Sequence, residues 1–338
     1  MPALRMIDAR WANLACQRLK DRRVPLTPLL RGIGLTRAQV NDPDCRIAFR
    51  KHAALLSAAA ELTGDASFAL RLAITLSPRQ AGPIGFIALS SQTLGDALRN
   101  FRRYQRVLSE GVGVHMESEG GFSALQAEII DPRVEDPLQA TEFVLGGGVT
   151  LCRRLAGPDL EIKRVEFAHE RHGRLSDYRT LLGVPLAFGQ ARNAIVMKSA
   201  MLQLPLKTAD DQLLTALTRL CEQILGDQPD DYDLVYQVRR HITELLPSGE
   251  PTMDRVAEEL GMSSRTLSRR LAEQEVTYRE LLDQTRHQLA LRYLKSDALR
   301  PSQIAYLLGY SEPSGFHHAF SRWTGHPPSR FRPGPVAA

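Results

Sequence analysis

The sequence predicts an α+β N-terminal domain followed by an all-α domain in which a long helix joins two helix-turn-helix motifs. Two observations carry this prediction. Alternating apolar residues, which are typical of half-buried strands, end near residue 197, and only helical periodicity remains after residue 234. Within that helical part, a pattern of two short helices around a glycine occurs twice.

The α+β domain is expected over residues 1–205. Residues 8–75 read mostly as helix, and glycine and proline break the pattern after them. Thr93 is a suitable N-cap for a long helix whose apolar residues share one face up to Leu108. Alternation then predicts a hairpin that turns at Gly120 and Gly121.

A helix over residues 137–156 is expected next. It contains the glycine run 146–148, which weakens a helix and therefore indicates that another element packs closely there. The rest of this domain is predicted to hold, in order, a strand at 165–167, a helix over 175–182, and a second hairpin formed by residues 186–188 and 195–197. Residues 206–233 are expected to be a helical linker. Dimerisation is expected through the domain of residues 1–205, with a contribution from this linker.

The repeated pattern occupies residues 256–271 and 304–320 of the final domain, 234–338. In each copy an alanine lies four residues before a glycine, and an apolar pair spaced by four residues follows the turn. The alanine permits close helix contact, and the glycine permits a turn conformation that a Cβ would obstruct. Ser263 and Ser311 are expected to cap the second helix of each copy. Residues 277–294 predict a connecting helix of about 27 Å.

Composition excludes several other classes of protein. Among 338 residues, 43 Lys and Arg stand against 38 Asp and Glu, and this small excess cannot by itself identify a nucleic-acid binder. The four cysteines lie far apart without a C-x-x-C pair, which argues against a disulfide scaffold or a zinc finger. No apolar run approaches the ~18–20 residues of a membrane span, and the N-terminus lacks a secretory signal. We therefore expect a cytoplasmic protein without membrane contact.

Residues 234–332 resemble the DNA-binding domain of the AraC/XylS family of bacterial transcription regulators. The stretch IAYLLGYSEPSGFHHAFSRWTGHPPSRFR in the second copy carries this resemblance. Residues 1–205 also resemble an arabinose-binding-type sensor domain of that family, through GFIALSSQTLGDALRNFRRYQRVL and LLGVPLAFGQARNAIVMKSAMLQLPL. The resemblance implies a transcription regulator, more often an activator than a repressor, that places the second helix of each motif in a major groove.

In the first motif, Leu267 and Leu271 should face inward, so the neighbouring polar residues should face DNA. These are Ser264, Arg265, Ser268 and Arg269. An arginine can bind the O6 and N7 atoms of guanine with two hydrogen bonds, although a solvated arginine face is the alternative interpretation.

The second motif should present a less basic face to DNA. Its expected DNA-facing residues are Ser314, Gly315, His317, His318, Ser321 and Arg322. The family often has arginine at the position of His318 and lysine at that of Ser321, so we expect the first motif to dominate the affinity.

One strongly basic helix face is expected in the N-terminal domain. It consists of Arg99, Arg102, Arg103 and Arg106. An anionic effector could bind there, or the arginines could be solvated or paired with acidic neighbours. The sequence His169-Glu170-Arg171-His172 is interpreted as a polar loop, and we expect neither a metal nor a cofactor.

The sequence thus predicts a non-enzymatic regulator. Its expected partners are double-stranded promoter or operator DNA, RNA polymerase, an unidentified small-molecule effector, and a second copy of the chain in a homodimer. Two alternatives stay open. One is an enzyme with a C-terminal DNA-targeting module, for which we find no nucleophile–base or carboxylate constellation. The other is a weakly specific nucleoid-type DNA binder, which the modest charge of residues 233–338 disfavours.

Overall fold

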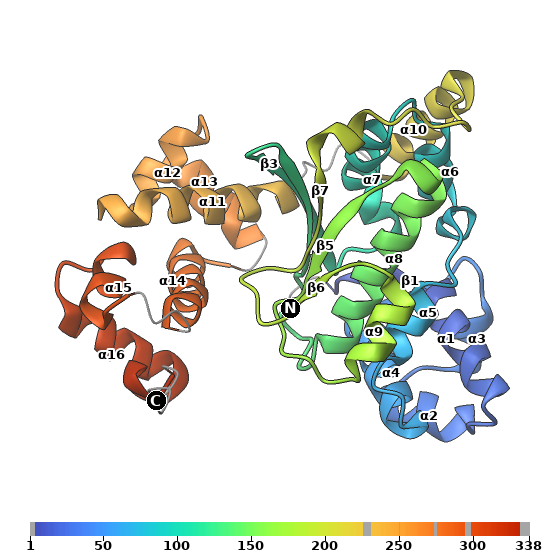
Figure 1. Ribbon diagram of the computed structural model, residues 1–338, viewed down its shortest axis with the longest axis horizontal. Coiled ribbons are helices and arrows are strands. Elements are labelled where there is room, and N and C mark those ends of the chain that lie inside the picture. Colours follow the sequence, from blue (N-terminus) through green and yellow to red (C-terminus); the bar gives the residue numbers. More distant parts are fainter. Residues whose placement is uncertain (1–3, 226–230, 250, 274–275, 295–298, 332–338) are drawn as a thin grey trace. The chain divides into compact units, whose positions relative to one another are not determined.

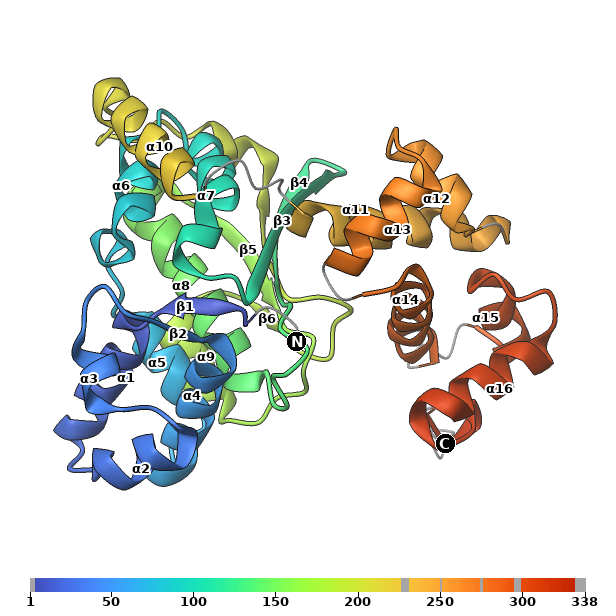
Figure 2. The ribbon, with the colours of Figure 1, turned by 180° about the vertical axis from the view of Figure 1, so that it is seen from behind.

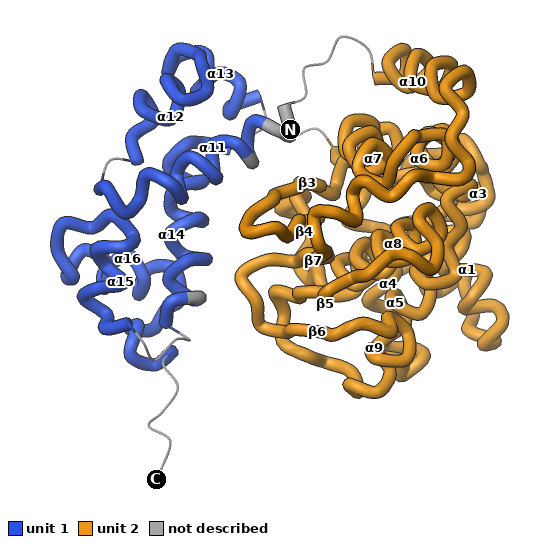
Figure 3. Tube along the Cα trace, turned by 45° about the horizontal axis from the view of Figure 1, so that its top comes forward, with its two compact units in different colours: residues 1–2, 228–338 blue, residues 3–227 orange. Residues whose placement is uncertain are grey.

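The computed structural model describes residues 4–225, 231–249, 251–273, 276–294 and 299–331. The chain divides into two compact units, residues 3–227 and residues 228–338 (Figure 3). Each unit is described by itself. The first combines helices with sheets and the second is helical, as the sequence predicts. No helix in the described part of the chain is long and apolar enough to cross a bilayer.

The first unit begins with a helical layer that includes a small antiparallel sheet. Apolar residues at helical spacing bury one face of each longer helix, and Leu55, Leu56 and Ala59 of the fourth helix are fully buried. The elements in order are β1 (Met6–Asp8), α1 (Arg10–Asp21), α2 (Leu26–Ile33), α3 (Arg37–Asn41), β2 (Arg46–Ala48), α4 (Phe49–Thr63) and α5 (Phe68–Ala73) (Figure 1).

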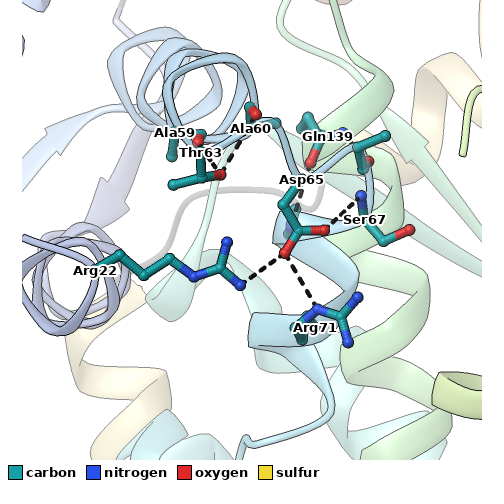
Figure 4. A network of polar contacts seen from close by, with 10 residues as sticks. Arg22, Ala59, Ala60, Thr63, Asp65, Ser67, Arg71 and Gln139 are labelled. Carbon is teal, nitrogen blue, oxygen red and sulfur yellow. Dashed lines mark hydrogen bonds and ion pairs between the residues drawn. The ribbon is translucent and has the colours of Figure 1, made fainter. Parts of the chain in front are cut away.

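A network of polar contacts surrounds the turn between α4 and α5 and links three helices (Figure 4). Asp65 Oδ2 lies 2.9 Å from Arg22 Nη2 and 3.2 Å from Arg71 Nε, and Asp65 Oδ1 accepts the amide hydrogen of Ser67. Gln139 of α8 (Leu138–Ala156) exchanges hydrogen bonds with the backbone beside this turn. The network therefore links α1, α5 and α8.

The main sheet has five strands in the order β3-β4-β7-β5-β6. Their bounds are β3 (Val112–Glu119), β4 (Phe122–Ile129), β5 (Ile162–Glu166), β6 (Leu186–Ala187) and β7 (Ala194–Lys198). The first predicted hairpin is confirmed, with Gly120 and Gly121 both at positive φ in its turn. The second predicted hairpin is wrong: β6 pairs in parallel with β5, whereas β7 lies between β4 and β5. Four residues of β7 are buried, which suits a strand paired on both sides.

Helix α8 packs against both α5 and the sheet, as its glycines indicate. A Cβ on Gly146 would lie 2.7 Å from Leu70 Cδ1, and one on Gly148 would lie 2.8 Å from Ile195 Cδ1. The helix accepts these residues despite their low propensity because larger ones would collide with its neighbours.

The segment expected as a linker contains α10 (Asp211–Leu225), which packs on α6 (Pro83–Ser90) and α7 (Leu94–Leu108) of the first unit (Figures 1 and 2). Ile84, Ile87, Tyr104 and Cys221 form the core of this contact. Thr93 caps α7 by accepting the Asp96 amide hydrogen, as predicted. The first unit also contains α9 (Leu175–Leu182) and three short 3-10 helices, η1 (Pro78–Ala81), η2 (Gly157–Asp159) and η3 (Ser199–Gln203).

The second unit contains two helical cores that share one long helix. Its elements are α11 (Asp231–Leu245), η4 (Leu246–Ser248), α12 (Met253–Glu259), α13 (Ser264–Glu273), α14 (Tyr278–Leu294), α15 (Pro301–Leu307), α16 (Pro313–Thr324) and η5 (Pro328–Phe331). Leu281 of α14 belongs to the core formed with α11, α12 and α13, while Ala290 and Leu294 belong to the core formed with α15 and α16. Both predicted helix-turn-helix motifs and the connecting helix are therefore present.

The turns of the two motifs differ in detail. Gly261 and Gly309 have φ of 65° and 71°, the left-handed conformation that glycine adopts readily. Ser263 accepts the Thr266 amide hydrogen at 3.2 Å, as expected of a cap. In the second motif Glu312, not Ser311, occupies the N-cap position. Proline at the next position has its φ preset for the first helical turn, so the helix begins there.

Candidate nucleic-acid interface

Helix α13 presents a polar face because two of its leucines are fully buried. Leu267 and Leu271 pack into the core with α11 and α12. Arg265, Ser268 and Arg269 are consequently exposed, whereas Ser264 is half-buried. All four predicted residues of the first motif thus lie on the side of α13 that faces away from the core of that motif.

The two predicted arginines of α13 differ in their surroundings. Arg269 Nη1 lies 2.6 Å from Glu273 Oε1 one turn later, and both side chains are about half exposed or more. Such exposed helix pairs contribute only about 0.3–0.5 kcal/mol, so a phosphate or a base can replace the glutamate at small cost. Arg265 has no hydrogen-bond or ion-pair partner among the described residues. Ser264 donates a hydrogen bond to Asp254 of α12, which fastens the start of α13.

Helix α16 is arranged similarly around Phe316 and Phe320, which are fully buried. Its exposed residues include Ser314, Gly315, His317, His318 and Arg322, and Ser321 is half-buried. Arg322 Nη2 lies 3.0 Å from Asp283 Oδ2 of α14, and Ser314 donates a hydrogen bond to Glu312 at 3.2 Å. Only one of the six predicted residues of this motif is permanently cationic.

An arginine of α14 holds the turn of the second motif. Arg286 Nε donates to the Leu308 carbonyl at 2.9 Å, and Nη2 donates to the Gly309 carbonyl at 3.2 Å. Its guanidinium lies 4.5 Å from the centre of the Tyr310 ring. The sequence offers no signal for this role, because the partners are backbone carbonyls 22 and 23 residues away.

The basic face predicted on α7 is largely engaged within the first unit. Arg99 Nη2 lies 2.6 Å from Asp96 Oδ1, and Arg103 Nη2 lies 2.9 Å from Glu222 Oε1 of α10. Arg102 is exposed, and Arg106 is half-buried with its carbonyl bound by Arg46. An anionic effector at this face would compete with two carboxylates of the protein itself.

In the loop that contains His169 and His172, the His169 ring packs against aromatic rings and does not belong to a cluster of metal-ligating side chains within the described ranges. The ring centroids of His169 and Phe167 are 5.1 Å apart, and His169 Nδ1 is within 2.8 Å of the Glu170 carbonyl. Among the residues that the structure describes, no group of three His, Cys, Asp or Glu side chains is placed to hold a metal ion.

Two family models match the chain. Residues 24–206 match the arabinose-binding domain of AraC transcription regulators, and residues 256–334 match a helix-turn-helix domain. The chain belongs to the AraC family of transcription regulators. This AraC-family protein is 30% identical over 296 residues to the ornithine utilization regulator of Pseudomonas aeruginosa, covering 88% of this chain and 87% of that protein.

Another relative of the AraC-family chain is also a regulator. It is 30% identical over 308 residues to the HTH-type transcriptional regulator VirS of Mycobacterium tuberculosis, covering 90% of each chain. The crystal structure of the transcriptional regulator CdpR from Pseudomonas aeruginosa covers 96% of this chain and 98% of its own, with 23% identity and a TM-score of 0.47. Membership in a family of transcription regulators means that this AraC-family protein is a DNA-binding transcription regulator.

Proposed function

We propose that this regulator recognises a specific operator by placing α13 and α16 in two successive major-groove segments on one face of the duplex. The observation that supports this most is the shared helix α14, which contributes residues to both motif cores. A helix of 17 residues is about 26 Å long, comparable with the ~34 Å between successive major-groove segments.

The first motif supplies most of the affinity in this proposal. Arg265 and Arg269 lie on the exposed face of α13, and an arginine can make two hydrogen bonds to guanine. In α16 the corresponding face carries His317 and His318 in place of arginines, and Arg322 is the one permanently cationic residue predicted there. Base contacts of the second motif then adjust specificity more than affinity.

The first unit is proposed to control the second in the cytoplasm by binding a small-molecule effector. An effector that binds one arrangement of the regulator better than another shifts the population between them. In the proposed role as an activator, that shift changes promoter occupancy or contact with RNA polymerase. The domain limits proposed are 1–205 for sensing, 206–233 for connection and 234–338 for DNA binding.

A homodimer is part of this proposal, and α10 offers a surface for it. Leu213, Leu220 and Ile224 lie on that helix with 42%, 41% and 53% of their surface exposed. Their spacing of seven and then four residues places them along one side of the helix. Two copies of such a stripe can pair with each other, as a two-fold interface requires.

Selection of bound duplexes from a random pool, with the full chain at physiological salt, tests the proposal. We expect enrichment of two short blocks about one helical turn apart. The same selection with Arg265→Ala should lose preference in one block only. Failure of the wild type to enrich any site, with and without a cell extract that supplies effectors, would contradict the proposal.

A further inference from the structure

An apolar cavity of about 150 Å³ lies inside the first unit. Helices α4, α7 and α8 and the β3–β4 hairpin contribute its walls. Leu98 and Phe101 of α7, Phe143 of α8 and Val114 of β3 line it, with Trp11 of α1. An engineered protein cavity of similar volume, lined by aliphatic and aromatic side chains, binds benzene. The space is therefore sufficient for a molecule with one aromatic ring.

One polar side chain in this apolar wall lacks a partner. His52 of α4 is only 1% exposed, and neither of its ring nitrogens has a hydrogen-bond partner among the described residues. Its ring packs on Phe143 with 5.6 Å between centroids. Burial lowers the pKa of His52 to about 4, so the ring is neutral near pH 7, with one donor and one acceptor nitrogen.

Three other polar residues along the wall are already engaged. Gln105 donates to the Val112 carbonyl at 2.9 Å, and Gln126 donates to Glu117. Ser109 Oγ accepts the backbone hydrogen of Gly111 at 3.3 Å. Burying a polar group without a partner is unfavourable, so a buried unpaired histidine indicates a missing hydrogen-bonding group.

We propose that this cavity binds the effector, and that the effector is a neutral, mainly apolar small molecule with one hydrogen-bonding group that meets His52. None of the described residues that line the cavity is Asp, Glu, Lys or Arg. A charged molecule would be desolvated there without a counter-charge, and a sugar would leave most of its hydroxyl groups unpaired. This inference rests on the proposed effector control, and it assigns the ligand class and the site.

The position of the cavity suits a regulatory site. The face of α7 that carries Leu98 and Phe101 lines the cavity, while Arg103 and Tyr104 of the same helix bind Glu222 of α10. Helix α10 ends at Leu225, close to the boundary between the two units in the chain. A ligand that shifts α7 therefore acts on the helix that leads to the DNA-binding unit.

The test uses the full chain and three single-ring probes: phenol, toluene and benzoate. Trp11 lines the cavity and the chain has only one other tryptophan, so the Trp323→Phe variant reports binding by Trp11 fluorescence. We expect phenol and toluene to change this fluorescence in a saturable manner, and benzoate to leave it unchanged. No saturable change with either neutral probe up to their solubility limits would overturn the proposal.

Two kinds of variant locate the site. Ala140→Leu and Val144→Phe both add volume at the cavity wall. Each should weaken the binding of phenol and of toluene at least tenfold, while a cooperative thermal unfolding transition shows that the variant still folds. His52→Leu should weaken phenol relative to toluene by about tenfold, because only phenol loses a hydrogen bond. If Ala140→Leu and Val144→Phe both fold and both bind the neutral probes as tightly as the parent protein, the proposed site is wrong. If His52→Leu leaves the ratio of phenol affinity to toluene affinity unchanged, the proposed role of His52 is wrong.

The two proposals fail separately. Probe binding needs no DNA, and operator selection needs no probe. Specific DNA binding without any probe binding would overturn this inference and leave the operator proposal standing. Probe binding without any enriched DNA site would overturn the operator proposal and leave the ligand-binding cavity standing.

Discussion

Arg103 of α7 and Glu222 of α10 form an ion pair with 2.9 Å between Nη2 and Oε1. The hydroxyl of Tyr104 donates to the same oxygen at 3.1 Å, and burial raises the pKa of this tyrosine to about 12. One carboxylate thus connects α10 to two neighbouring residues of α7. This contact fastens a segment that the sequence predicts to be a linker onto the body of the first unit.

Removal of this carboxylate should loosen α10 selectively. We expect Glu222→Ala to cost about 1 kcal/mol, since the ion pair is half-exposed and the tyrosine hydroxyl loses its acceptor. Hydrogen exchange should accelerate in residues 211–225 and stay unchanged in α8. Glu222→Gln is the matched control, because its amide oxygen still accepts from Tyr104. Equal protection of α10 in wild type and Glu222→Ala would disprove this anchoring role.

Substitutions on α13 should separate base contacts from phosphate contacts. Arg265→Ala and Arg269→Ala are each expected to weaken cognate binding by about 1–3 kcal/mol if the arginine reads a base. The measurement compares the selected operator, an operator with the contacted block mutated, and random DNA at several salt concentrations. A loss of equal size on all three duplexes would instead identify a phosphate contact. Arg240→Ala on α11, which removes an exposed pair with Glu244, serves as the control.

Glu142 of α8 should make stability depend on pH. Its side chain is fully buried, and burial is the main cause that raises its pKa from 4.5 to about 7, with the charge of Asp65 adding to the rise. The hydroxyl of Tyr178 donates to it and opposes the shift, and His169 Nε2 lies 3.8 Å away. The folded state therefore binds more protons between pH 4.5 and 7, so the free energy of unfolding falls as pH rises through this window.

The Glu142→Gln variant should abolish that fall, which amounts to about 3 kcal/mol over the window. Burial lowers the pKa of His169, which adds an opposite slope below pH 6.5, but both proteins keep this histidine. Urea unfolding of wild type and variant at pH 5, 6, 7 and 8 measures the difference. Parallel pH profiles for the two proteins would show that Glu142 does not titrate in this range.

The Asp65 network should contribute to the stability of the first unit. Asp65→Ala removes the partner of two arginines, each about one-third exposed, and the acceptor of the Ser67 amide hydrogen. Because solvent screens the arginines, we expect a loss of about 1–2 kcal/mol in urea unfolding. Asp65→Asn keeps an acceptor for the amide and should lose less. An Asn variant as unstable as the Ala variant would assign the effect to the charge alone.

The exposed stripe on α10 should decide the oligomeric state. Leu220→Glu combined with Ile224→Glu places charges in the proposed interface, and we expect a dimer to become a monomer without loss of the folded first unit. Sedimentation equilibrium measures the mass, and circular dichroism measures folding. Leu62→Glu, at another exposed leucine, is the control. A dimer that survives the double substitution would place the interface elsewhere.

Local structure could be predicted from the sequence because it depends on neighbouring residues. The cap at Thr93, the turn at Gly120 and Gly121 and the repeated Ala–Gly spacing each act within a few residues. Burial of Leu267 and Leu271 follows from helical period alone, and it places Arg265 and Arg269 on the outer face. The resemblance to the AraC family rests on the second copy of the repeat and on residues 85–108 and 181–206.

Contacts between distant segments could not be predicted in this way. The insertion of β7 between β4 and β5, and the docking of α10 on α7, depend on which apolar faces are left to be covered after the other elements have packed. Arg286 gives no sequence signal because it binds backbone carbonyls.

The sequence by itself therefore determined the longer helices, the first hairpin, the two helix-turn-helix motifs and the outward face of α13, since periodicity and capping are properties of adjacent residues. Only the tertiary structure decided that the inner face of α7, rather than its arginines, lines a cavity, and that His52 lies in its wall without a partner. The physical reason is that a cavity and an unpaired buried nitrogen exist only where side chains from several distant segments meet.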